Sequence, residues 1–426
     1  EAQAECRFLL LSPNNLLKPS DGGPVAVPSQ DMVLGIYYLT QERPGALGEG
    51  KSFKSVNEAI LAYENGIITL HSKINVRVTK TLENGTVKSD VINSTLGRFL
   101  FNEIIPQDLG FVDRSIPENE CKLEVDFLVR KKELKKILEK VINTHGATKT
   151  AEVLDLIKST GYKYSTRASM TVSISDMTVP AQKKDMLAAA EATVDKIMKN
   201  FRRGLITEEE RYKEVVATWF DTDAKLTDAL ISGLDKYNNI FMMADSGARG
   251  SNQQIKQLAG MRGLMADTSG RTIELPIKSN FREGLDVLEY FISAHGARKG
   301  LSDTALRTAD SGYLTRRLVD VSQELIIREV DCSEGKEIPG MVVKAFMEGQ
   351  EVIEGLKDRI TGRYLAEDIV DPETGEILIK KNHMITPKRA EIIEKLGLKE
   401  VKIRTVLSCK SHLGVCAKCY GANMAT

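Results

Sequence analysis

Three cysteines near the C-terminal end of the sequence have the spacing of a metal-binding site. Cys409, Cys416 and Cys419 follow one another with six and then two residues between them. Two intervening residues allow both thiolates to face one ion, as in the knuckles of structural zinc sites. A closed structural zinc site has four protein ligands, so the sequence must supply one more.

The fourth ligand must come from another cysteine or from a nearby histidine. Cys332 lies in REVDCSEGKE, a polar stretch that is typical of an exposed turn. Cys6 and Cys121 flank apolar runs and have the surroundings of small core residues. His412 lies inside the six-residue gap and is the rival ligand. We favour Cys332, which gives a structural site of four thiolates, and the simpler alternative is a set of unrelated thiols.

Two other features could carry chemistry, and we expect neither to do so. GALGEGKS at residues 45–52 formally matches the phosphate-binding loop, which works only between a strand and a helix of a parallel sheet. Here TQERP separates the glycines from the preceding apolar run, and the next helix is predicted to begin near Ser55 or Asn57. We therefore interpret the match as a chance one. His71, His145 and His383 are isolated in the sequence, and we expect them at the surface or in loops.

Length and composition indicate a multidomain protein without a strong charge. The chain has 426 residues, of which 42% are hydrophobic, with 59 basic and 59 acidic residues. A free-standing nucleic-acid binder usually carries a basic surplus, so nucleic-acid contacts must come from local patches. No apolar run approaches the roughly 18 residues of a membrane span. The few cysteines and the lack of a signal-peptide pattern indicate a reducing cytosol, and the start at Glu1 rather than Met indicates an internal piece of a longer chain.

The elements that precede the metal motif are predicted from apolar periodicity and from turn residues. Residues 1–40 are predicted to form short strands, because VAVPSQDMVLGIYYLT mixes β-branched and aromatic residues. Strands such as KINVRVTKTL follow, with a turn at Asn84–Gly85. KKELKKILEKVINTHG and TKTAEVLDLIKSTG predict two helices, each ending at a glycine.

Two longer helices are predicted next, joined by a short turn. The first runs from Pro180 to Gly204, and a capping box at Thr207 begins the second. Such a pair forms an antiparallel hairpin. Its exposed tip could be a partner surface, and a purely structural hairpin is the alternative.

The most unusual stretch is Leu285–Val321, which has a helical apolar pattern throughout. A helix of that length would span about 55 Å at ~1.5 Å per residue. Between Tyr290 and Val319 it carries five basic residues and two acidic ones, a local surplus that the whole chain lacks. Three glycines lie in its interior, each unfavourable by about 1 kcal/mol relative to alanine: Gly296, Gly300 and Gly312. These features predict a strut that bends or is closely approached, and the alternative is a core helix with a solvated basic face.

The segments on either side of this helix differ in character. Ala244–Met265 combines glycines with Arg249, Lys256 and Arg262, which would suit close approach to a phosphate. After Cys332 the sequence predicts short strands, a turn and one small helix before the last three cysteines. We therefore expect a β-rich insert whose two ends return to the metal site.

Over essentially its whole length the sequence resembles the bacterial RNA polymerase largest-subunit family, beta-prime. The resemblance rests on PSQDMVLGIYYLT, GRFLFNEIIP, MADSGARGSNQQIKQLAGMRGLM, PIKSNFREGLDVLEYFISAHGARKGLSDTALRTADSGYLTRRLVDV and VCAKCYG. It implies a multidomain mixed α+β fold. The implied parts are the end of a double-psi β-barrel (1–42), a mixed α/β connector with helices (43–165), a helical hairpin at the secondary-channel rim (166–243), a glycine/arginine loop beside the active centre (244–284), the bridge helix (285–322), and a β-rich insert with the zinc-binding region (323–426).

The resemblance also implies a function, as part of the catalytic subunit of a DNA-directed RNA polymerase, a nucleotidyltransferase. In that family the 3′-hydroxyl of the transcript attacks the α-phosphate of an incoming nucleotide, with a pair of magnesium ions at the reacting oxygens. The family's N-A-D-F-D-G-D motif, which holds magnesium, is expected just before Glu1, and its mobile trigger segment just after Thr426. We therefore expect no catalytic residue in this chain and no activity from the chain alone.

The resemblance assigns roles to individual residues. The family's zinc site, with one structural Zn²⁺, matches Cys332, Cys409, Cys416 and Cys419. Arg249 is implied to contact the triphosphate, and the small residues Thr304, Ala305 and Thr308 to seat the terminal base pair. The implied contacts to the template or its backbone, where cations give sequence-independent affinity, are Arg298, Lys299, Tyr313 and Arg316.

The implied partners are the beta, alpha, omega and sigma subunits, the DNA template, RNA and nucleoside triphosphates. Regulators of the secondary channel are further candidates at the hairpin. The implied location is the cytoplasm, at the nucleoid, with no membrane contact. The rival from another class is a non-catalytic, zinc-containing assembly module that binds only protein, and a phosphate-loop ATPase is a distant third.

Overall fold

The structure is a computed structural model that describes residues 1–81, 87–333, 338–348, 351–370 and 375–425. It contains two compact units. Unit 1 comprises residues 1–16 and 24–302, and unit 2 comprises residues 17–23 and 303–426. The turn predicted at Asn84–Gly85 lies outside the described residues.

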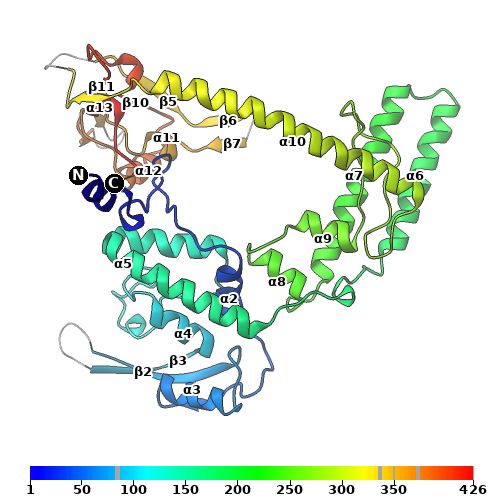
Figure 1. The fold of residues 1–426 in the computed structure, drawn as a ribbon, viewed down its shortest axis with the longest axis horizontal. Coiled ribbons are helices and arrows are strands. Elements are labelled where there is room, and N and C mark those ends of the chain that lie inside the picture. Colours follow the sequence, from blue (N-terminus) through cyan, green and yellow to red (C-terminus); the bar gives the residue numbers. More distant parts are fainter. Residues whose placement is uncertain (82–86, 334–337, 349–350, 371–374, 426) are drawn as a thin grey trace. The chain divides into compact units, whose positions relative to one another are not determined.

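The largest core of unit 1 lies between helices and a small sheet (Figure 1). The helices are α2 (Asp31–Thr40), α3 (Val56–Glu64), α4 (Leu96–Ile104) and α5 (Lys131–Ala168). The sheet has the order β1 (Ser52–Phe53), β2 (Lys73–Thr81), β3 (Val87–Thr95), with β1 parallel and β3 antiparallel to β2. Val76 pairs with Ile92, and both are buried beneath the helices of this core.

The prediction of strands in residues 1–40 is wrong. The segment begins with α1 (Ala2–Glu5), a π-helical turn (Cys6–Leu10) and a 3-10 turn (Ser12–Asn14), and residues 31–40 form the helix α2. Seven of the ten α2 residues are buried, so the helix is apolar on nearly every side and shows no helical period. A short apolar run of this kind does not distinguish a helix from a strand. Asp31 in the first turn favours the helix through the helix dipole.

Helices α2 and α5 touch through their backbones, and glycines make this approach possible. A Cβ added to Gly35 would lie 1.9 Å from the carbonyl oxygen of Gly161, and one added to Gly161 would lie 2.7 Å from that of Met32. The prediction that the second helix ends at Gly161 is wrong, because α5 continues through this glycine to Ala168. The break predicted at Gly146 is confirmed, because its φ of 74° kinks the helix.

We predict that Gly35→Ala lowers the free energy of unfolding of unit 1 by about 3 kcal/mol, because the added methyl group must push two packed backbones apart. Gly233→Ala is the matched control: it is also a helical glycine, and an added Cβ would meet no atom within 4 Å. Urea denaturation of the two variants checks this. Equal midpoints would show that the α2–α5 contact tolerates a side chain.

The predicted helical hairpin is confirmed. It consists of α6 (Lys183–Arg202) and α7 (Glu208–Gly233), which pack around Ile197, Val215 and Trp219. The Thr207 side chain accepts from the Glu210 backbone N–H and the Glu210 side chain accepts from the Thr207 N–H, which is the predicted capping box. Two short helices follow, α8 (Asn239–Asp245) and α9 (Asn252–Ala259).

The long helix predicted at residues 285–321 is α10 (Val287–Ser322), a single element of 36 residues in which the three glycines cause no break. Glu289 accepts from the backbone N–H of Asp286, which satisfies a donor at the start of the helix. It also accepts from the backbone N–H of Lys278 in the preceding segment. Among the described residues, no helix is both long enough and apolar enough to cross a membrane.

The part of unit 2 that follows α10 is built from paired short strands, as predicted for the insert. The pairs are β5 (Met341–Lys344) with β10 (Glu400–Ile403), β6 (Phe346–Glu348) with β7 (Glu351–Glu354), β8 (Ile369–Val370) with β9 (Ile377–Ile379), and β4 (Ile327–Glu329) with β11 (Val415–Cys416). In the described part of this region, three short helices accompany them where one was predicted: α11 (Leu356–Ile360), α12 (Pro387–Lys395) and α13 (Ala417–Tyr420). A small core around Ile360, Ile385 and Ile393 supports the strands.

Candidate functional site

The structure brings the four predicted cysteines of unit 2 together. β4 and β11 pair in parallel, which places Cys332, just after β4, beside Cys416 at the end of β11. The Sγ atom of Cys332 lies 3.8 Å from that of Cys419 and 3.7 Å from that of Cys409. All four Sγ atoms lie within 4.8 Å of one another. Cys332 is therefore the fourth member of the cluster, as predicted.

This donor set fits a zinc ion. Four sulfurs placed tetrahedrally at about 2.3 Å from zinc lie about 3.8 Å apart, close to the separations found here. Cys416 and Cys419 are buried, and Cys332 and Cys409 are half-buried, so the cluster has the enclosure of a structural site. When bound, a zinc ion would hold the thiols as thiolates and cross-link the ends of the insert.

The other candidate ligands stay outside the cluster. His412, the rival, is not among the residues whose ligand atoms converge there in the described part of the chain. Cys121 is buried in the core of unit 1, as predicted. Cys6 is exposed, so its prediction as a core residue is wrong. The apolar run beside it, Phe8 to Leu11, is exposed as well.

Three charged side chains surround the cysteines. Arg404 is 1% exposed and donates to the Asp331 carboxylate at 2.9 Å, and Lys418 donates to the other oxygen of that carboxylate at 2.7 Å. Burial raises the pKa of Asp331, but the hydrogen bonds from Arg404 and Lys418 outweigh burial and hold this pKa well below its usual range. The sequence analysis missed Arg404. The available signal was a basic residue directly after an apolar strand and five positions before Cys409.

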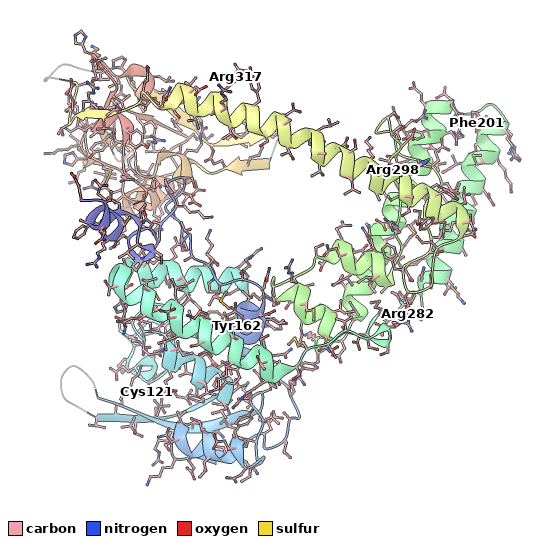
Figure 2. All side chains as sticks on the ribbon, in the orientation of Figure 1. Cys121, Tyr162, Phe201, Arg282, Arg298 and Arg317 are labelled. Carbon is pink, nitrogen blue, oxygen red and sulfur yellow. The ribbon has the colours of Figure 1, made fainter. Side chains whose placement is uncertain are left out.

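The seven residues that the resemblance assigns to nucleic acid all lie on α10, which Figure 2 shows with Arg298 labelled. Lys299 is half-buried, and the other six are exposed: Arg298, Thr304, Ala305, Thr308, Tyr313 and Arg316. At ~100° per residue, Arg298, Ala305 and Arg316 share one face, with Thr304 and Thr308 to one side of it and Tyr313 to the other. The residues therefore form a broad band around the helix, not a narrow stripe.

The N-terminal part of α10 is anchored within unit 1. Lys299 donates through Nζ to the carbonyl oxygen of Asp267 at 3.1 Å. A Cβ added to Gly296 would lie 2.6 Å from the Cε atom of Met265, and Ser293 is buried. The glycine/arginine loop therefore packs against this helix through Met265.

Of the three basic residues in Ala244–Met265, only Arg249 is exposed. Lys256 is buried and paired with Asp223 at 2.6 Å. The Arg262 guanidinium lies over the ring of Phe281 at 4.7 Å, and burial lowers its pKa. Lys256 and Arg262 therefore stabilise the fold, and Arg249 is the one of these three residues that remains a candidate for contact with a phosphate.

The phosphate-loop match at residues 45–52 is a chance one, as interpreted. Its backbone donors are already used: Gly45 N–H donates to the Glu49 carboxylate and Gly50 N–H donates to the carbonyl of Lys73. The following helix α3 is capped by Ser55, as predicted, and does not begin at the glycines. No set of free amides is therefore aimed at a phosphate.

His71 lies in the turn before β2, in agreement with the prediction of a surface or loop position, but its side chain is buried. His71 is 5% exposed, and burial lowers its pKa to about 4, so it is neutral at pH 7. Its Nδ1 lies 3.1 Å from the carbonyl oxygen of Gln41, so Nδ1 carries the proton and donates. His71 is thus a core histidine, packed edge-on against the ring of Tyr38.

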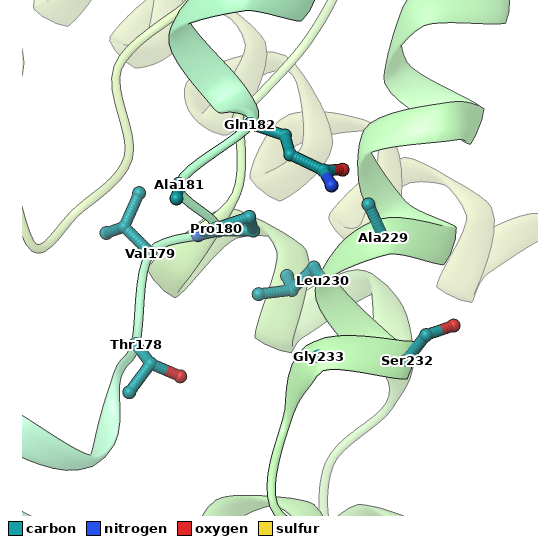
Figure 3. A pocket seen from close by; sticks show the side chains of 9 residues that line it. All are labelled: Thr178, Val179, Pro180, Ala181, Gln182, Ala229, Leu230, Ser232 and Gly233. Carbon is teal, nitrogen blue, oxygen red and sulfur yellow. The ribbon is translucent and has the colours of Figure 1, made fainter.

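A further pocket lies in unit 1 beside the start of α6 (Figure 3). Residues 178–182 and the last turns of α7 line it, and its polar side chains are those of Thr178, Gln182 and Ser232. None of its lining residues is charged. Such a lining suits neither a divalent metal nor a phosphate group, so the four-cysteine cluster and α10 are the stronger candidates.

Comparison with known proteins identifies the family. Three family models match successive parts of the chain: RNA polymerase Rpb1 domain 3 at residues 15–177, domain 4 at residues 206–282 and domain 5 at residues 284–397. The DNA-directed RNA polymerase subunit beta' of Lachnoclostridium phytofermentans is 75% identical in an alignment that covers all of this chain and 34% of the length of that protein. The corresponding subunits of Acetivibrio thermocellus and Clostridium tetani are 61% and 60% identical, with 36% and 37% of their lengths covered.

The chain thus spans about a third of the length of the curated relatives it matches. The three family models follow one another along it in the order of their domains, and the relatives align over its full length. The chain belongs to the family of RNA polymerase beta' subunits.

Proposed function

We propose that the chain is the central part of the catalytic subunit of a DNA-directed RNA polymerase, where it positions template, transcript end and incoming nucleoside triphosphate. The observation that carries this proposal is the solvent exposure of α10. Every residue from 304 to 321 is exposed, including Leu306, Leu314 and Leu318, while the chain as a whole has well-packed cores. A long helix with exposed leucines and a basic surplus needs other molecules to cover it.

The proposed roles of residues on and near α10 are based on the size, charge and exposure of their side chains. Thr304, Ala305 and Thr308 present small side chains on which a base pair can rest. Arg298 and Arg316 share a face and are suited to the sugar–phosphate backbone. The exposed Arg249 is the proposed contact to the triphosphate. Lys299 and Tyr313 complete the proposed template contacts, with Lys299 also bound to the protein backbone.

The remaining parts have supporting roles in this proposal. Residues 1–42 belong to the end of a double-psi barrel, α6 and α7 form the secondary-channel rim, and α10 is the bridge helix. One structural zinc ion is held by the four cysteines. The sequence contains no D-x-D-x-D motif, so residues in another part of the subunit hold the catalytic magnesium ions.

The proposed partners are the beta, alpha, omega and sigma subunits, with DNA, RNA and nucleoside triphosphates as ligands. Regulators that enter the secondary channel are proposed to dock at the hairpin tip, residues 203–207, near the labelled Phe201 (Figure 2). The alternative, an assembly module that binds only protein, predicts that α10 is covered by protein alone.

The double variant Arg298→Ala/Arg316→Ala distinguishes the polymerase function from the module that binds only protein. In an assembled polymerase on a template–transcript scaffold, it should shorten the lifetime of the complex and reduce the slope of log lifetime against log salt by roughly one to two, because phosphate contacts release counterions. Lys158→Ala, which removes an exposed, ion-paired cation of α5, is the control and should change neither. An unchanged lifetime and slope in the double variant would favour the protein-only module.

A further inference from the structure

The four cysteine sulfurs do not all receive the same kind of hydrogen bond. The backbone N–H of Lys410 lies 3.4 Å from the Sγ of Cys332, that of Cys416 lies 3.3 Å from Cys409, and that of Cys419 lies 3.4 Å from Cys416. These three contacts are typical of tight metal-binding turns, in which backbone amides point at the thiolates. Cys419 receives no such contact from a backbone amide among the described residues. Its Sγ instead lies 3.3 Å from Nη2 of Arg404.

The guanidinium of Arg404 is fixed from several directions. Nη1 donates to the side-chain oxygen of Asn382 at 2.9 Å, and Nη2 donates to Asp331 at the same distance. The backbone N–H of Arg404 donates to the carbonyl of Tyr364 at 2.7 Å, directly after strand β10. This strand carries Ile403 into the small core of unit 2. The guanidinium is therefore held from two sides, by the insert through Asn382 and strand β10, and by Asp331, which directly precedes Cys332.

The contact between Arg404 and Cys419 matters because a zinc-bound cluster would be negatively charged. A zinc ion with four thiolates has a net charge of −2, which burial makes unfavourable unless cations or N–H donors lie close by. Nη2 of Arg404 lies 3.3 Å from Cys419, 3.7 Å from Cys416 and 3.9 Å from Cys332, so it faces three of the four sulfurs. Lys418, the nearby cation, is already paired with Asp331.

We propose that Arg404 is a positioning residue of the metal centre: its guanidinium holds the Cys419 thiolate in place, offsets the negative charge of the four thiolates, and makes zinc retention depend on the folded insert. This inference rests on the proposed zinc site and adds to it a residue from outside the cysteine motifs. Lysine can replace arginine only in part here, because an ammonium keeps the charge but lacks the planar fork that reaches Asn382, Asp331 and Cys419 together.

The test compares Arg404→Met with the unmodified subunit in the assembled polymerase. Loss of a residue that supports metal ligands typically weakens metal binding by about 10- to 100-fold. We expect zinc to pass to a chromogenic chelator faster by about that factor, with Arg404→Lys intermediate. In the cobalt-substituted protein the sulfur-to-cobalt charge-transfer band should shift, and iodoacetamide should modify Cys419 before the other three cysteines.

Ile385→Ala is the matched control for simple destabilisation, because Ile385 is fully buried in the same small core and is not a member of the cysteine cluster. It should leave the cobalt spectrum and the order of cysteine modification unchanged. If Arg404→Met does not assemble, Arg404→Lys carries the same readouts. Zinc release at the unmodified rate, or an unchanged spectrum and modification order in both Arg404 variants, would overturn the proposal. Absence of zinc from the unmodified subunit would overturn the zinc site together with it.

Discussion

Cys332→Ser should abolish zinc binding as completely as Cys416→Ser, while Cys6→Ser and Cys121→Ser should each retain one zinc ion per chain. The geometry gives the reason. The Sγ of Cys332 is 3.7 Å from the Sγ of Cys409 and 3.8 Å from the Sγ of Cys419, so it is placed as one of the four ligands of a tetrahedral site. A serine hydroxyl is a poor replacement for a thiolate on zinc, and three thiolates leave an open position that a structural site does not tolerate.

Loss of the metal should also unfold the region around it. β4 and β11 are only three and two residues long, and a structural zinc ion contributes folding energy directly. Metal content by mass spectrometry of the folded protein and limited proteolysis around residues 406–421 measure the two effects. Cys121→Ser is the informative control, since it changes a buried cysteine of unit 1 that the cluster does not include. Zinc retained by Cys332→Ser and lost from His412→Ala would mean that the fourth ligand is the histidine.

The sequence was sufficient to predict that the four cysteines come together, because their spacing and polar surroundings are local properties. It was not sufficient to predict the role of Arg404, since its contact to Cys419 joins the end of strand β10 to helix α13, 15 residues later, and depends on the tertiary fold. Likewise, the long helix α10 follows from its own periodicity, but the approach of Met265 to Gly296 depends on how the preceding loop folds back. Spacing therefore indicated which residue types can act together, whereas tertiary packing decided which neighbours support them.

The errors have the same physical origin. α2 was predicted as strand because burial on nearly all sides removes the helical period from its sequence. The loop position of His71 agrees with the prediction, but its burial against Tyr38 was not predicted, because an isolated histidine carries no sign of burial. Lys256 and Arg262 have the residue types of a phosphate site, and their actual partners are Asp223 and Phe281. In each case a distant segment of the chain determines the environment.

Thr304→Trp should stop nucleotide addition in an assembled polymerase, which is the largest effect that the proposed function predicts for α10. Thr304 is exposed in this chain, and Thr308, one turn later, lies on the same side of the helix. A base pair can rest there only if the side chains are small, and an indole would occupy the space of the incoming pair. Because Thr304 is exposed, the substitution should not disturb the core of either unit, so assembly of the enzyme should be unaffected.

The matched control is Val321→Trp, which places the same indole on the same exposed helix but 17 residues further on, beyond the last proposed contact at Arg316. This separation is about 25 Å along the helix at ~1.5 Å per residue. Val321 is 78% exposed, so this variant also leaves the cores intact. Single-nucleotide addition on a defined template measures both variants, after gel filtration has shown that each is incorporated into the enzyme. We expect addition by Thr304→Trp to fall by at least about a hundredfold, equivalent to about 2.7 kcal/mol in the barrier, with a much smaller change for Val321→Trp. Full activity of Thr304→Trp would contradict the proposed base-pair seat on α10, and equal losses in both variants would mean that the exposed part of α10 tolerates no added bulk at either position.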